Sequence, residues 1–183
     1  EINRWKYYDF FIKEIFSSDN FYKRKYSIIF YNQCFKVFSF GFICKNGLLN
    51  DFIILMKDKV NLISTNAIEL IYNFNKKIIC YSTKKFQELC GILNEIYDLN
   101  IKAFNDNESK DKHKGIIFDK EKNIIINKII SINNTISKYY TEEEISKEKE
   151  IENKLYQNEQ EIFKLDKSIN NKNKSKMKKK MKM

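Results

Sequence analysis

The chain has 183 residues, a length typical of one domain or of one small domain with an extension, and its 43% hydrophobic and 15% aromatic residues are enough to build a core. A fully disordered chain is therefore excluded. A transmembrane span is excluded as well, because charged or amide residues interrupt every apolar run before it reaches about 18 residues. The net charge of +10 is uneven, since residues 171–183 hold seven Lys and no acidic residue. We predict a disordered Lys-rich tail there, able to bind nucleic acid or an anionic membrane.

The composition also indicates the origin of the lysines. Ile, Lys and Asn account for 29, 32 and 22 residues, respectively. All three have codons rich in A and T, so an AT-biased genome would produce this composition by default. The abundance of lysine is therefore weak evidence for any function.

Cysteine and histidine are sparse. The residues Cys34, Cys44, Cys80 and Cys90 form no CxxC pair, and the single His113 lies in a polar stretch. No zinc site or other metal site is therefore expected. The apolar neighbours of the cysteines indicate free buried thiols in a reducing compartment, which favours a cytoplasmic protein. With one His and no glycine-rich phosphate loop, the sequence predicts neither an enzyme nor a bound cofactor.

Residues 1–104 are the most aromatic part of the chain and are predicted to form short strands. Residues 10–17 and 22–31 are expected to pair as a hairpin, because β-branched and aromatic residues favour strands and residues 18–20 suit a turn. A helical spacing of apolar residues over 1–16 is an open alternative. Further strands are predicted over 34–42, 52–56, 60–64, 67–74 and 77–82.

A helix is predicted over 84–99, where apolar residues recur at spacings of three and four and Ser82 or Thr83 can cap the first turn. Its apolar stripe contains Phe86, Leu89, Cys90, Leu93, Ile96 and Tyr97. Short antiparallel strands closed by one amphipathic helix are typical of a mainly β (α+β) architecture. We therefore expect residues 1–104 to form a pleckstrin-homology-like β-sandwich or barrel with a C-terminal capping helix.

Three further zones follow that domain. Residues 105–114 are predicted as a polar linker, and the Ile-rich unit 115–140 fits either two strands or one helix. A charged helical extension is predicted over 141–170, because Thr141 and Glu144 match a capping box. Its apolar residues form a brief heptad-like pattern, which fits an exposed charged helix or a coiled-coil interface. These residues are Ile151, Leu155, Ile162, Leu165 and Ile169, interrupted by Asn158.

The candidate binding residues are basic and aromatic side chains of the predicted hairpin, namely Lys13, Tyr22, Lys23, Arg24 and Lys25. Strand alternation would place Lys23 and Lys25 on one face. With Lys13 on the neighbouring strand, this spacing suits the lipid-headgroup pocket of a pleckstrin-homology-like fold, where amines bind inositol phosphates. Basic residues on an edge strand also prevent aggregation, so both interpretations remain open.

The segments FFIKEIF…NFYKRKYSIIF and IICYSTKKFQELCGILNEIYDLN, over about residues 9–100, resemble the N-terminal pleckstrin-homology-like region of the large endosomal DnaJ co-chaperones of receptor-mediated endocytosis. This resemblance implies a non-catalytic membrane-targeting or adaptor module within a larger trafficking co-chaperone. It implies a peripheral location on endosomal membranes, with a phosphoinositide and other trafficking proteins as partners. It also implies that residues 115–140 begin a second such module.

Two alternative functions come from the basic tail and from the charged helix. The chain could be a basic RNA-associated protein, such as an organellar ribosomal component, that contacts RNA through its lysines. It could also be a protein-interaction scaffold that assembles through the helix at 145–169.

Overall fold

The computed structural model describes residues 18–108 and 119–180, and all regular elements in these two ranges are α-helices. In chain order they are α2 (Phe21–Val37), α3 (Phe40–Lys45), α4 (Leu48–Met56), α5 (Asn61–Asn73), α6 (Asn75–Tyr81), α7 (Thr83–Glu108), α8 (Lys120–Asn134), α9 (Ile136–Tyr139) and α10 (Glu142–Lys180). The expected mainly β, pleckstrin-homology-like fold is therefore wrong. The segments predicted as strands after residue 20 form α2 to α6, and residues 10–17 lie outside the described ranges.

The positions of the buried residues explain why helices form in place of strands. Ile, Phe and Tyr favour strands as single residues, but this preference depends strongly on context. A half-buried strand buries every second residue, whereas one face of a helix is buried at spacings of three and four. Helix α2 follows the helical pattern, since its buried residues are Arg24, Ser27, Ile28, Tyr31, Cys34 and Phe35.

Short polar turns separate the first three helices. Asn20 caps α2, with its Oδ1 accepting a hydrogen bond from the N–H of Tyr22 at 2.9 Å. Ser39 caps α3, with its Oγ accepting from the N–H of Phe42 at 3.1 Å. Gly47 has a φ of +76° between α3 and α4, a conformation that a residue with a Cβ adopts only with strain. Helices α2, α3 and α4 therefore follow one another with only short connections between them.

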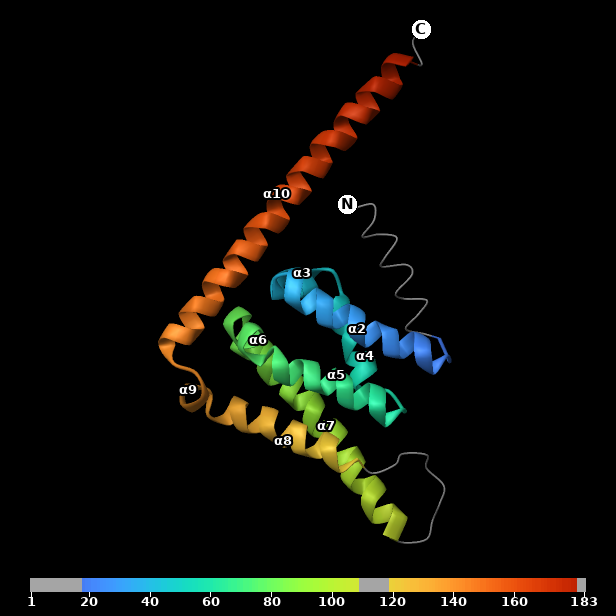
Figure 1. Cartoon of the computed structure of the whole chain (residues 1–183), viewed down its shortest axis with the longest axis vertical. Coiled ribbons are helices and arrows are strands. Elements are labelled where there is room, and N and C mark those ends of the chain that lie inside the picture. Colours follow the sequence, from blue (N-terminus) through green and yellow to red (C-terminus); the bar gives the residue numbers. More distant parts are fainter. Residues whose placement is uncertain (1–17, 109–118, 181–183) are drawn as a thin grey trace.

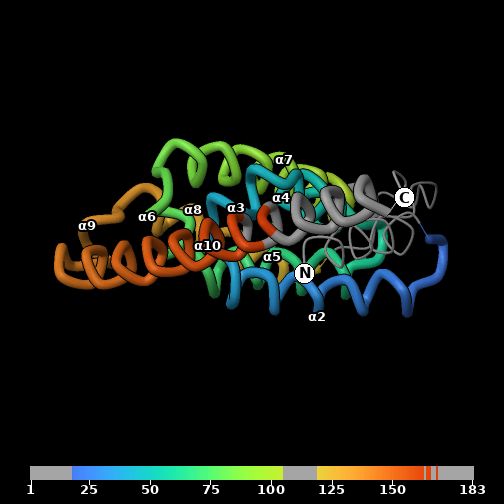
Figure 2. Tube along the Cα trace, turned by 90° about the horizontal axis from the view of Figure 1, so that it is seen from above, coloured from blue at the N-terminus to red at the C-terminus, as the bar shows by residue number. Residues whose placement is uncertain are grey.

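Helix α5 lies at the centre of the helical body, which we define as α2 to α8. It packs against α2, α4, α6 and α8, while α7 packs against α6 and α8. Figure 2 shows α2 and α7 at opposite edges of this body. Aromatic rings fill the space between α2 and α4, since the Phe35 and Phe52 ring centroids lie 5.3 Å apart. A single core cluster joins α2 to α7 with α8.

Helices α7 and α8 form the middle of the chain. The helix expected over 84–99 is confirmed within α7, and Ser82 Oγ caps it by accepting from the N–H of Lys85 at 3.2 Å. The alternative left open for 115–140 is decided in favour of a helix at 120–134, which is α8. The side chains of Ile126, Ile129 and Ile132 complete the core from this helix.

The capping box at Thr141 and Glu144 is confirmed: the N–H of Glu144 donates to Thr141 Oγ1 at 3.2 Å, and the N–H of Thr141 donates to Glu144 Oε2 at 2.9 Å. Helix α10 then continues to Lys180, through most of the segment predicted as a disordered tail. Figure 1 shows α10 running along the body and then extending past it. Residues 142–161 contain eight Glu and three Lys, whereas residues 162–180 contain eight Lys and one Asp.

Candidate functional site

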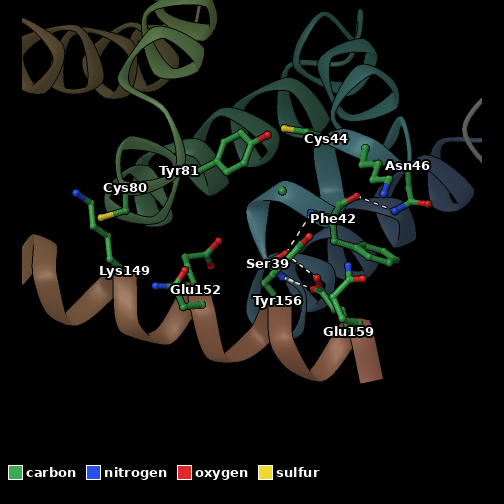
Figure 3. A pocket seen from close by; sticks show the side chains of 14 residues that line it. Ser39, Phe42, Cys44, Asn46, Cys80, Tyr81, Lys149, Glu152, Tyr156 and Glu159 are labelled. Carbon is green, nitrogen blue, oxygen red and sulfur yellow. Dashed lines mark hydrogen bonds between the residues drawn. The ribbon is translucent and has the colours of Figure 1, made fainter. Parts of the chain in front are cut away.

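Two carboxylates of α10 are buried against the start of α3. Glu159 Oε1 accepts from the backbone N–H of Ser39 at 2.6 Å, and its Oε2 accepts from the Ser39 hydroxyl at 2.7 Å. Glu152 Oε2 accepts from the N–H of Phe40 at 2.7 Å. The first N–H groups of a helix have no acceptor within the helix and bear partial positive charge, which suits carboxylate acceptors. Figure 3 shows both side chains pointing from α10 toward α3.

The same face of α10 also contacts α6. Lys77 Nζ lies 2.8 Å from Glu152 Oε1, with side-chain exposures of only 6% and 11%. Near the start of α10, the Cys80 thiol donates to the carbonyl oxygen of Ile145 at 3.6 Å. We call Glu152 and Glu159 the α10 anchors. Sequence reasoning missed them, because nothing in the sequence distinguishes these two Glu residues from the six others in the first half of the helix.

A pocket of about 960 Å³ lies beside the anchors, between α3, α6 and α10. Tyr81 covers part of it and packs on Gly41, where a Cβ would lie 3.2 Å from the tyrosine ring. Cys44 and Cys80 line it from opposite sides of Tyr81 (Figure 3). Burial raises the pKa of both thiols to about 11. They are therefore protonated at neutral pH and lack the thiolate character that nucleophilic catalysis needs.

A second face of α10 carries apolar residues, and three of them, Ile151, Ile162 and Leu165, are exposed. We define the α10 seam as Ile151, Leu155, Asn158, Ile162, Leu165 and Ile169, which follow one another at spacings of four and three. The exposed fractions of Ile151, Ile162 and Leu165 are 50%, 42% and 62%. At about 100° per residue, the seam lies roughly a quarter of a turn from the α10 anchors. The pocket-lining residues Asn153 and Gln160 lie on the opposite side of the anchors.

The predicted lipid-binding residues that lie within the described ranges all belong to α2, and they point in different directions. Tyr22, Lys23 and Lys25 are exposed on α2. Residues two positions apart on a helix differ by about 200°, so Lys23 and Lys25 do not share a face as they would on a strand. Lys13 lies outside the described residues. A lipid-binding role for the exposed members of this group stays a prediction.

Arg24, the remaining member of that group, is buried in an ion pair. Its Nε donates to Asp58 Oδ2 at 2.7 Å, and its Nη1 donates to the carbonyl oxygen of Ser18 at 2.9 Å. The Asp58 carboxylate also accepts from the N–H of Val60 at 2.8 Å, at the start of α5. Arg24 therefore fastens α2 to the turn between α4 and α5.

A buried polar cluster joins the start of α8 to α5. Lys122 is 4% exposed, and its Nζ donates to Asn61 Oδ1 at 2.8 Å. Burial lowers the pKa of Lys122, and the nearby carboxylates of Asp119 and Asp58 oppose this effect. Asp119 Oδ2 in turn accepts from the Thr65 hydroxyl at 2.8 Å. These contacts position α8, and they join segments that are far apart in the sequence.

No protein-family model matches the sequence, and no curated protein or solved structure is significantly similar to it. In residues 18–108 and 119–180, no group of three His, Cys, Asp or Glu side chains is placed to hold a metal ion. Among the helices described there, none is long and apolar enough to cross a membrane.

Proposed function

We propose that the chain is a non-catalytic interaction scaffold, in which the helical body holds α10 so that its seam can pair with another α-helix. The observation that carries this proposal is the exposure of Ile151, Ile162 and Leu165 on a helix whose neighbouring face is fixed by buried carboxylates. Large apolar side chains in a row at heptad spacing are costly to leave in water. A partner helix with apolar residues at spacings of three and four would cover them.

The α10 anchors contribute to this function by fixing the orientation of the helix. An isolated helix of this length would lose conformational freedom on binding, and that loss reduces affinity. In the folded chain, the carboxylates of Glu152 and Glu159 hold one face of α10 against α3 and α6. The seam is thereby presented as a straight, preorganised surface.

Site-specific photo-cross-linking in living cells tests the proposal. A photoreactive residue in place of Asn158, which is exposed within the seam, is expected to form a cross-link to a protein segment with apolar residues at spacings of three and four. The matched control has the same residue in place of Gln157, which is exposed on a different face of α10. Equal yields at the two positions, or cross-links only to lipid or nucleic acid, would contradict the proposal.

A second candidate function is contact with an anionic membrane surface through the far end of α10. The specific observation in its favour is that α10 continues as a helix to Lys180 and extends past the body (Figure 1). Residues 162–180 have eight Lys and one Asp, so this end attracts anionic headgroups. Vesicle flotation with anionic lipids tests this second function.

A further inference from the structure

The partner of the α10 seam follows from the charge distribution along the helix. Eight of the nine acidic residues of α10 lie in the half that contacts the body, and eight of its eleven lysines lie in the half that extends past it. Two copies of α10 placed side by side in opposite directions would bring the acidic half of each next to the basic half of the other. Parallel copies would place like charges together, which is unfavourable.

The seam is compatible with this opposite orientation at the level of single residues. We consider the register in which residue 160 of one copy faces residue 160 of the other. Each seam residue then faces a seam residue of the second copy, so that Ile151 faces Ile169, Leu155 faces Leu165, and Asn158 faces Ile162. On either side of the crossing point there are three such layers, and two of them are wholly apolar. The third contains Asn158, and a polar residue in such a seam helps to select one register.

The heptad positions just beyond the seam support the same register. On the N-terminal side they are Glu148 and Glu144, and on the C-terminal side they are Lys172 and Lys176. In the antiparallel register Glu148 faces Lys172 of the second copy, whereas Glu144 pairs with Lys76 of α6 in its own chain at 3.3 Å. The apolar layers are thus flanked at both ends by pairs of opposite charge.

The body of each copy leaves room for this arrangement. The anchoring contacts of α10 with the body extend as far as Glu159, close to the crossing point at residue 160. Beyond that point α10 extends past the body, as Figure 1 shows. The body of the second copy would lie beside this extending half. The seam also lies away from the face that contacts α3 and α6, so pairing does not require the α10 anchors to break.

We propose that two copies of this chain associate through an antiparallel pairing of their α10 seams, with Glu148 of each copy facing Lys172 of the other. This proposal rests on the proposed function and names the partner helix as a second copy. The seam spans fewer than three heptads, so the association is expected to depend on concentration.

Sedimentation equilibrium of the full chain over a wide concentration range tests this proposal. The wild type is expected to show a monomer–dimer equilibrium. Leu165→Lys should raise the dissociation constant by about tenfold or more, because it places a charge within an apolar layer. The matched control Gln157→Lys adds the same charge on an exposed position outside the seam and should change the constant by less than about threefold. A chain that stays monomeric throughout, or a dimer indifferent to Leu165→Lys, would overturn the proposal.

Charge exchange tests the orientation. Glu148→Lys alone should weaken the dimer, and combining it with Lys172→Glu should restore the wild-type constant, because the exchanged residues face each other again in the antiparallel register. If the double variant does not restore the wild-type dissociation constant, this register is wrong. A strictly monomeric chain that still forms the cross-link at position 158 in cells would leave the scaffold function standing, with a different protein as the partner.

Discussion

The carboxylate of Glu159 and the backbone N–H of Ser39 are 2.6 Å apart, although 120 residues separate them in the chain. Glu159 is 7% exposed and Ser39 is 2% exposed, so water does not compete for this contact. The same carboxylate accepts from the Ser39 hydroxyl, which in turn accepts from the N–H of Phe42. One side chain of α10 therefore completes the N-terminal cap of α3 and fixes the position of α10 on the body.

Glu159→Ala should destabilise the chain markedly. The substitution leaves the N–H and the hydroxyl of Ser39 buried without their acceptor, and an unsatisfied buried group costs about 1–3 kcal/mol. We expect the free energy of unfolding in urea to fall by about 2–3 kcal/mol. Glu161→Ala, an exposed position on the same helix, is the control and should change it by less than about 0.5 kcal/mol. Similar effects of the two variants would show that Glu159 does not anchor α10.

Arg24→Met should lower the free energy of unfolding more than Lys25→Met does. Arg24 and Asp58 form an ion pair with side-chain exposures of 8% and 7%, and removing one partner leaves the other charge buried and unpaired. Such a loss costs about 3–5 kcal/mol. Lys25 is exposed, so its replacement should have almost no effect on unfolding in urea. The double variant Arg24→Met/Asp58→Asn should lose less stability than the sum of the losses in the two single variants. A loss equal to that sum would argue against the ion pair.

The stability of the chain should depend on the ionisation of Cys34 at alkaline pH. Burial raises the pKa of this thiol from 9.0 to about 12. Below pH 9 both folded and unfolded chains keep the thiol proton, and this contribution to stability is constant. Between pH 9 and about 12 only the unfolded chain releases it, so the free energy of unfolding falls by up to about 1.4 kcal/mol per pH unit.

The variant Cys34→Ala lacks this titration and isolates its effect. Urea unfolding of both proteins at pH 7 to 10.5 should give a stability difference that is constant up to about pH 9. Above that pH, the wild type should lose stability faster than the variant. A difference that stays constant through pH 10.5 would show that the thiol is not buried in the folded chain.

Two basic regions can be compared for their contribution to membrane binding. Replacing Lys178, Lys179 and Lys180 with Gln should reduce flotation with anionic vesicles containing phosphatidylserine and phosphoinositides, because each lysine near such a surface contributes about 1 kcal/mol. The difference in flotation between this variant and the wild type should disappear at high salt, where charges are screened. Lys23→Gln/Lys25→Gln tests the predicted lipid residues on α2 and should have the smaller effect. A larger effect of the α2 variant would place membrane binding on that helix.

The sequence predicted the helices that have strong periodicity or caps. The apolar stripe around Phe86 and Leu93 and the capping box at Thr141 are local patterns, and both are confirmed. The prediction of strands is wrong because Ile and Phe are abundant throughout this chain, so their presence is a poor guide to secondary structure. The helical spacing of the buried residues in α2 was the stronger signal.

The contacts that carry the site could not be predicted in the same way. Glu152 and Lys77 come from distant parts of the chain, and either residue alone is typical of a solvated helix face. Arg24 was expected to face an anionic ligand, but its partner is Asp58, because the fold brings α2 beside the turn after α4. The α10 seam was visible as a heptad-like pattern, but its exposure depends on which face of α10 contacts the body.

Hydrogen exchange at the backbone amides of Ser39 and Phe40 tests the central claim most directly, namely that carboxylates of α10 hold the start of α3. These amides donate to Glu159 and Glu152 at 2.6 and 2.7 Å. We predict slow exchange at both amides in the wild type and a selective loss of protection at Ser39 in Glu159→Ala, while amides in the middle of α5 stay protected. Rapid exchange at Ser39 and Phe40 in the wild type, at the rate of an unstructured peptide, would contradict the docking of α10 on the body.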